Sequence, residues 1–144
     1  MTNDRNGSDR YARGWQNLQA VDAEAGKRVI EGLQDIAPDL GRYIVEFAFG
    51  DVYDRPGLDL RSRGIATIAA LTALGTAAPQ LRVHVNAGLN VGLTPDEIVE
   101  VITHLAVYAG FPAALNGIAV AREVFAERGI HVTPPKTLPS AQEI

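Results

Sequence analysis

The chain has 144 residues, of which 47% are apolar, and this suits one folded domain with a real hydrophobic core. Its 13 Lys and Arg against 17 Asp and Glu give a net charge of −4 with no basic block, which argues against a nucleic-acid partner. The absence of cysteine and the presence of only 3 His exclude disulfides and thiol chemistry and disfavour a His-rich metal site, so we expect no metal or redox cofactor and a cytoplasmic location.

The two ends of the chain differ in composition from its middle. Residues 1–13 are polar and charged, without the apolar core of a signal peptide, and predict a flexible N-terminal arm. Residues 131–144 include Pro134, Pro135 and Pro139 and predict an extended C-terminal tail. Residues 14–130 predict one helical domain. No apolar run reaches the ~20 residues that span a bilayer, so we expect no membrane partner.

Two helices are predicted in the first half of this domain. The first covers about residues 20–35 and is broken by Ala37-Pro38. The second covers about residues 39–53, up to Pro56-Gly57. Its expected inward face consists of Leu40, Tyr43, Ile44, Phe47 and Ala48.

Four more helices are predicted by their end signals. Asp59 is suited to cap a helix that Gly75 ends. Thr94 and Glu97 form a capping-box pattern, with Pro95 at the first helical position. The predicted ranges are 59–74, 79–92, 94–109 and 112–128. The fold class is therefore all-α, a compact bundle of about six helices.

The helix from Ile65 to Leu74 is apolar nearly all round and rich in alanine. Such a helix is normally buried on every side, and a domain this small has few helices to cover it. We therefore expect a homo-oligomer in which a second copy supplies the cover. The alternative is that this helix lies at the centre of a monomeric bundle.

Two histidines lie in apolar helical surroundings. His84 shares a helix face with Leu81 and Val85, and His104 lies one turn before Tyr108. An imidazole in such a place can donate or accept a proton near neutral pH. The alternative is that each is a core histidine satisfied by local hydrogen bonds. His131, in the tail, is expected to face solvent.

Charged side chains gather around the end of the second predicted helix. Residues 46–57 combine aromatic, acidic and basic side chains, and they form either a polar pocket wall or a plain helix end with solvated charges. Arg61 and Arg63 precede the apolar helix. One of them binds a carboxylate in bidentate fashion, or both are simply charges at a helix start.

Several motifs in a fixed order resemble the carboxymuconolactone decarboxylase family, over about residues 10–128. They are Arg10–Gly14, Phe47–Leu58, Arg61–Gly75, Leu81–Thr94 and Glu97–Ala114. The resemblance implies an all-α fold, also found in alkylhydroperoxidase-like relatives, and ring-like trimers or hexamers. Those relatives use a Cys-x-x-Cys pair, which this chain lacks.

The resemblance also implies the site. The recurrent histidines of the family fall on His84 and His104, its acidic residue falls on Asp51, and its Tyr-Ala-Gly turn begins at Tyr108. Three positions depart from the family pattern: Asn86 stands where relatives resembling the decarboxylase usually carry Arg, Val91 where they carry Asn, and Gly64 where they carry Ser. The loss of an Arg removes a carboxylate partner, which bears on the substrate more than on the fold.

The function implied is cofactor-independent decarboxylation of 4-carboxymuconolactone, giving the 3-oxoadipate enol lactone in the β-ketoadipate route of aromatic catabolism. The reaction needs a cation for the carboxylates, a donor at the developing oxyanion and an acid for carbon. We predict Arg63, His84 and His104 as catalytic residues and Asp51, Tyr108 and Asn86 as substrate-binding residues, with Asp51 also suited to fix a histidine tautomer. The ligand would be an unsaturated lactone acid. Two alternatives are a related enzyme acting on another lactone or enolisable ring in secondary metabolism, and a non-catalytic helical oligomer that binds a small ligand.

Overall fold

A computed structural model describes residues 7–134, and this part of the chain is helical without strands. Its elements are α1 (Gly7–Gly32), α2 (Pro38–Tyr43), η1 (Ile44–Val52), α3 (Leu60–Leu74), α4 (Ala78–Asn90), α5 (Pro95–Ala109) and α6 (Phe111–Glu127). Because η1 continues α2 without a break, the described chain forms six helices. This confirms the predicted fold class of about six helices in an all-α arrangement.

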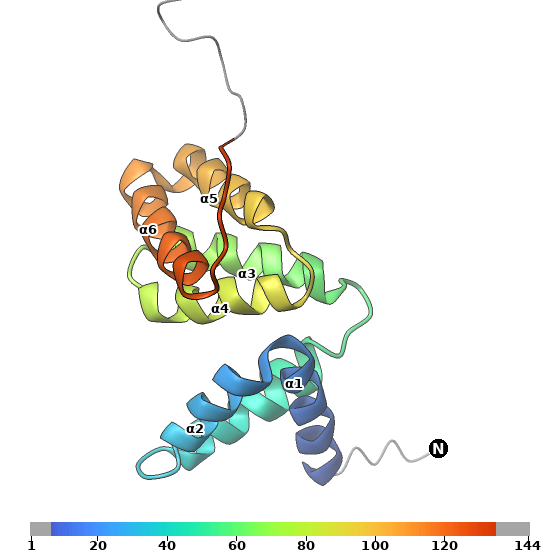
Figure 1. Cartoon of the computed structure of the whole chain (residues 1–144). Helices are drawn as coiled ribbons and strands as arrows, with labels where there is room; N and C mark the ends of the chain where they lie inside the picture. The colour runs from blue at the N-terminus through green and yellow to red at the C-terminus, as the bar shows by residue number, and fades with distance from the viewer. Residues whose placement is uncertain (1–6, 135–144) are drawn as a thin grey trace, which may run out of the picture.

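The helices form two groups that meet side by side (Figure 1). α1, α2 and η1 enclose a small core around Val45 and Phe49. α3 to α6 enclose a larger core, in which Ile68, Ile98 and Ile102 are fully buried. α4 joins the groups, because Ala87 on α4 packs into the smaller core while its neighbours pack into the larger one.

The predicted helix ends of the larger group are confirmed in atomic detail. The Asp59 carboxylate accepts a hydrogen bond from the Ser62 backbone N–H at 2.7 Å. Thr94 and Glu97 form both hydrogen bonds of the capping box, at 3.1 and 3.3 Å. Gly75 ends α3 with a φ of 70°, a left-handed conformation that suits glycine.

The N-terminal helix starts earlier than the sequence predicted. Residues 7–13, expected in a flexible arm, form the first turns of α1; residues 1–6 lie outside the described part of the chain. Asp22 interrupts the helix with an extended backbone (φ −161°, ψ 90°), and its carboxylate caps the next segment by accepting from the Ala25 N–H at 3.1 Å. The short polar side chain of Asp22 thus turns one long helix into two kinked halves.

The second predicted helix has the right extent, and Ile44 and Ala48 of its predicted inward face pack against the smaller core. Leu40, Tyr43 and Phe47, expected inside, are exposed, whereas Val45 and Phe49 are buried. Ile44–Val52 forms a π-helix, in which the Tyr53 N–H bonds to the Ala48 carbonyl five residues back, at 2.9 Å. A π-helix has more residues per turn than the 3.6 assumed, so the inward face shifts at Phe47, whereas Leu40 and Tyr43 are exposed on the preceding α2.

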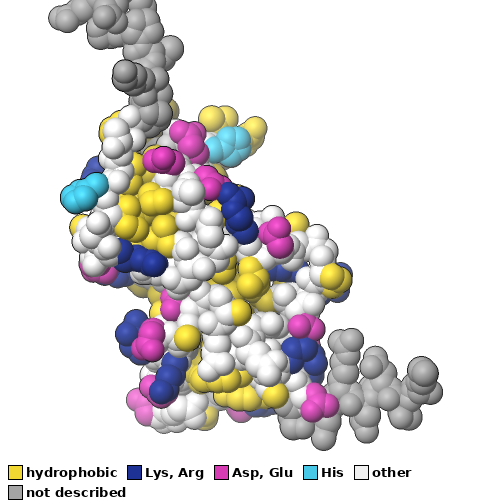
Figure 2. Space-filling view, turned by 45° about the vertical axis from the view of Figure 1, so that its right-hand side comes forward, with side chains coloured by type: hydrophobic (Ala, Val, Ile, Leu, Met, Phe, Trp, Pro, Cys, Tyr) yellow, Lys and Arg dark blue, Asp and Glu magenta, His cyan; other side chains and the backbone are white. Residues whose placement is uncertain are grey.

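The chain leaves α6 through a glycine turn. The Gly129 N–H bonds to the Ala126 carbonyl and the Ile130 N–H to the Phe125 carbonyl, at 3.1 and 2.8 Å, which is a Schellman motif. Residues 130–134 then run without helix, and Ile130 and Val132 pack against the larger core, while residues 135–144 lie outside the described part of the chain. Near the point where the described chain ends, hydrophobic side chains form a surface patch (Figure 2). None of the helices described is long and apolar enough to cross a membrane.

Candidate functional site

Asp51 is held by two arginines of α1. Arg10 binds it through two nitrogens, at 2.6 and 3.2 Å, and Arg13 lies 3.5 Å from it. Arg13 also donates to the Gly50 carbonyl at 2.8 Å. Gly14 and Gly50 permit the close approach of α1 and η1, because a Cβ atom on Gly14 would lie 1.9 Å from the Val45 carbonyl oxygen and one on Gly50 would lie 2.7 Å from the Arg10 carbonyl oxygen. The Asp51 carboxylate therefore links η1 to α1 through ion pairs.

Glu46 is a second acidic residue bound at this junction. It is 8% exposed, and its carboxylate lies 3.5 Å from Arg42 and 3.9 Å from Arg10. A carboxylate this buried needs positive partners to offset its desolvation. Residues 46–57 thus form, in part, a network of ion pairs between α1 and η1.

Arg63 lies at the start of α3 against Tyr53. Its guanidinium carbon is 5.6 Å from the Tyr53 ring centroid, within cation–π range, and one terminal nitrogen donates to the Arg55 carbonyl at 3.0 Å. The Tyr53 hydroxyl is 3.4 Å from Thr67 Oγ1, one turn further along α3. Arg63 Nε is buried and has no hydrogen-bond partner within residues 7–134. A buried charged donor left in this state is a suitable place for a ligand carboxylate.

His84 is half-buried on α4, where that helix packs against α1. Burial lowers the pKa of its imidazole below the usual 6.5, and the negative charge of Asp22 opposes this shift in part. His84 is therefore mainly neutral at pH 7. A neutral imidazole still donates one N–H hydrogen bond, which suits it to an oxyanion better than to the role of a cationic acid.

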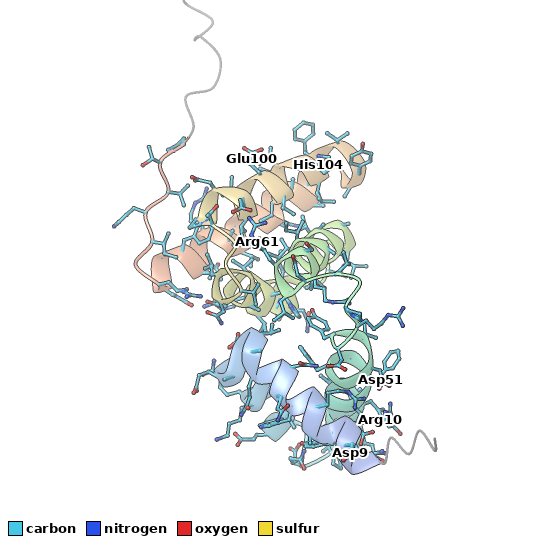
Figure 3. All side chains as sticks on the ribbon, turned by 90° about the vertical axis from the view of Figure 1, so that its right-hand side faces the viewer. Asp9, Arg10, Asp51, Arg61, Glu100 and His104 are labelled. Carbon is cyan, nitrogen blue, oxygen red and sulfur yellow. The ribbon has the colours of Figure 1, made fainter. Side chains whose placement is uncertain are left out.

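His104 and Tyr108 are neighbours on α5, with ring centroids 5.2 Å apart. Both are exposed in the single chain, Tyr108 to 76%. Figure 3 shows His104 and Glu100 at one end of the molecule, with Asp51 and Arg10 at the other. Within one chain, His104 and Asp51 therefore lie at opposite ends of the molecule.

The three positions expected to depart from the family pattern are Asn86, Gly64 and Val91. The Asn86 side chain donates to the Arg82 carbonyl one turn back on α4, at 3.2 Å. Gly64 on α3 faces Val91 and Leu93 after α4. Asn86 is thus engaged with its own helix, and the other two positions share one contact region.

Sequence reasoning missed several of these partners. Tyr53 and Thr67 lie within the motifs that resemble the family, but their pairing depends on the packing of α3 against the end of η1. The sequence gives no sign that Asp22 lies near His84, because Asp22 is placed there by a kink in α1. Among residues 7–134, no three His, Asp or Glu side chains come together as metal ligands.

Comparisons with known proteins agree with this architecture. The model of the carboxymuconolactone decarboxylase family matches residues 38–123. A 4-carboxymuconolactone decarboxylase from Acinetobacter baylyi is 39% identical over 126 residues, which are 87% of this chain and 93% of that protein.

Two further relatives cover less of the chain. An uncharacterised 15.0 kDa protein from Paracoccus denitrificans is 34% identical over 68% of this chain and 74% of its own length. The nitrosuccinic acid decarboxylase of Metarhizium robertsii is 36% identical over 56% of this chain and 55% of its own length. With a family match over most of its helices and a 39% identical relative along nearly its whole length, the chain belongs to the carboxymuconolactone decarboxylase family.

Proposed function

We propose that the protein is a cofactor-independent decarboxylase of 4-carboxymuconolactone or a close analogue. The observation that carries this proposal is the 39% identity to a 4-carboxymuconolactone decarboxylase over 93% of that relative. The relative named for nitrosuccinic acid supports decarboxylation as the reaction class, although its substrate differs.

The chemistry sets clear demands on the site. Loss of CO2 leaves its bonding electron pair on the ring, and the pair is delocalised onto the lactone carbonyl oxygen as a dienolate. A proton then has to be delivered to carbon. The site must hold the carboxylates, stabilise the oxyanion and supply the proton.

Arg63 is proposed to hold a substrate carboxylate. Support comes from its Nε, which is buried and has no hydrogen-bond partner within residues 7–134, and from its hydrogen bond to the Arg55 carbonyl, at 3.0 Å, which uses another nitrogen. A carboxylate at Nε would satisfy this donor and neutralise the guanidinium charge. The Tyr53 ring against Arg63 restricts its movement.

His84 is proposed as the hydrogen-bond donor at the lactone oxygen. Its lowered pKa favours the neutral form, whose single N–H can donate a hydrogen bond to an oxyanion. Proton delivery to carbon then falls to His104 or to water. Tyr108 and Asn86 are proposed as substrate contacts, while Asp51 is proposed to act through the position of α1 and η1 rather than by touching a histidine.

A homo-oligomer, a trimer or hexamer, is proposed as the working form. Large apolar side chains are exposed where α3 and α5 end and α6 begins, namely Leu74, Val107, Tyr108, Phe111 and Leu115. Exposed apolar groups of this size mark protein interfaces. A second copy covering them would bury His104 and bring partner residues to it. Light scattering at micromolar concentration tests this, and a monomer mass would contradict it.

Another carboxylic acid is the second candidate substrate. It is favoured by Asn86, which removes an Arg expected from the family pattern and bonds to its own helix instead. Such a site would bind a single carboxylate, through Arg63, whereas a site with both arginines would bind two carboxylates. The reaction class is unchanged by this alternative.

The deciding experiment is CO2 release from 4-carboxymuconolactone, nitrosuccinate and a panel of unsaturated lactone acids. We expect turnover of at least one acid, and we expect Arg63→Gln to raise its KM about tenfold or more. Arg61→Gln is the matched control, because Arg61 is exposed and pairs with Glu97. If no acid releases CO2, and ligand binding is indifferent to His84→Ala and His104→Ala, the protein is a non-catalytic binder.

A further inference from the structure

A pocket of about 520 Å³ lies under the chain that follows α6. Its walls come from α5, α6 and the segment 129–134, and we name it the C-terminal pocket. Its lining includes Ile118, Arg122, Phe125, Ala126, Ile130 and His131. It contains none of the residues proposed above for decarboxylation.

The outer wall of this pocket is fixed at its start. The Schellman motif at Gly129 turns the chain back, and Ile130 and Val132 then pack against the larger core. A volume of this size is in the usual range of small-molecule sites, roughly 300–1,000 Å³. Figure 2 shows the apolar patch in this half of the molecule, with basic, acidic and histidine side chains at its edges.

The charge of the lining is one-sided. Its ionisable side chains are Arg122 and His131, with no Asp or Glu among them. Arg122 forms no ion pair within residues 7–134, whereas Arg82, on the neighbouring α4, pairs with Glu123 and Glu127 of α6. An arginine beside an apolar pocket and without an acidic partner is complementary to an anion that carries a hydrophobic body.

We propose that the C-terminal pocket binds a hydrophobic monocarboxylate, with the apolar tail against Phe125 and Ile118 and the carboxylate at Arg122. Such a ligand differs from the compact polar acids proposed as substrates. This site is independent of the proposed function, because it needs neither Arg63 nor His84. Either proposal can therefore fail without the other.

The test uses the full chain with octanoate as the probe. Octanoate binding is measured by calorimetry and by changes in amide chemical shifts. We expect saturable binding, with shifts concentrated in residues 118–134. Arg122→Gln should weaken octanoate binding about tenfold, as expected for loss of a charged hydrogen bond. Arg28→Gln is the matched control, since Arg28 is an exposed arginine on α1, outside the pocket.

Two further measurements separate the contribution of the ligand's apolar tail from that of its carboxylate. Ala126→Trp places a large ring at an exposed lining position and should abolish binding, while its melting curve reports whether the fold is kept. 1-Octanol should bind the wild type more weakly than octanoate does. The two ligands should bind Arg122→Gln with equal affinity.

Several outcomes would overturn the proposal. Equal affinity of octanoate and 1-octanol for the wild type would show that no carboxylate is recognised. Shifts centred on Arg63 and His84 would show that octanoate enters the substrate site instead. Absence of binding, combined with a smaller assembly mass for Ala126→Trp, would show that a second copy of the chain covers the pocket.

Discussion

Gly64 of α3 and Val91 after α4 face each other, since a Cβ atom on Gly64 would lie 3.6 Å from Cγ2 of Val91. The same Cβ would be 3.5 Å from Cδ1 of Leu93 and 3.8 Å from Cα of Gly88. These are ordinary van der Waals distances, so the site has room for one methyl group. Gly64 and Val91, two of the three positions expected to depart from the family pattern, therefore occupy one place in the fold.

Gly64→Ala should stabilise the protein. Glycine inside a helix costs about 1 kcal/mol relative to alanine, and the new methyl group meets no close contact. We expect a melting temperature about 3 °C higher. Gly117→Ala is the control, because its Cβ would lie 2.9 Å from Ile102 Cγ2 in the core and should lower the melting temperature. Equal losses for both variants would contradict this account.

Gly14→Ala should be severely destabilising. Its Cβ would meet the Val45 carbonyl oxygen at 1.9 Å, and a backbone atom of η1 cannot move aside as a flexible side chain can. We expect a loss of about 3 kcal/mol, the upper end for overpacking, or detachment of α1. Gly32→Ala, also on α1 but with nothing within 4 Å of its Cβ, should leave the melting curve nearly unchanged. Limited proteolysis distinguishes a detached α1 from global unfolding.

Much of the fold could be predicted from the sequence, because helix ends depend on local chemistry. The capping box at Thr94 and Glu97 and the left-handed Gly75 form within a few residues of chain, so their sequence signals are complete. The α1 kink and the π-helix are different. Asp22 and Ile44–Val52 adopt their conformations in a packed pair of helices, and a 3.6-residue period carries no sign of either.

The candidate site was harder to predict for the same reason. His104 and Tyr108 are close because they are one helical turn apart, which spacing alone implies. The contact of Arg63 with Tyr53, and the binding of Asp51 by Arg10, depend on how separate helices pack. Sequence spacing identifies side chains on one helix, whereas the ion pairs of Asp51 need α1 in place.

The pH dependence of stability should contain a contribution from His84. Burial lowers its pKa in the folded chain below the usual 6.5 of an unfolded chain, so the folded state binds a proton less readily. The stability from neutral His84 is thus fully present above about pH 6.5 and is lost as the pH falls toward the folded pKa.

Urea unfolding from about pH 7.5 down to about pH 5 tests this contribution. His84→Gln should show a shallower decline in unfolding free energy than the wild type. His131→Gln, at an exposed position beyond α6, should retain the wild-type decline. Identical pH profiles for the wild type and His84→Gln would mean that His84 is not desolvated in the folded protein.

His84 is also the residue whose loss should most reduce catalysis. We expect His84→Ala to lower kcat at least about 100-fold on the true substrate, the low end for loss of an acid–base or oxyanion group, with the fold kept. His104→Ala should lower kcat less than His84→Ala does if His104 only shapes the substrate site. A purely structural His84 predicts the reverse pattern, a lower melting temperature with unchanged kcat per folded molecule, because a core histidine contributes through packing and hydrogen bonds. Melting temperature and CO2 release measured on one sample separate these outcomes.

Wild-type turnover in both variants would shift the mechanism to Arg63 and backbone donors, since Arg63 would then be the remaining cationic group of the proposed site.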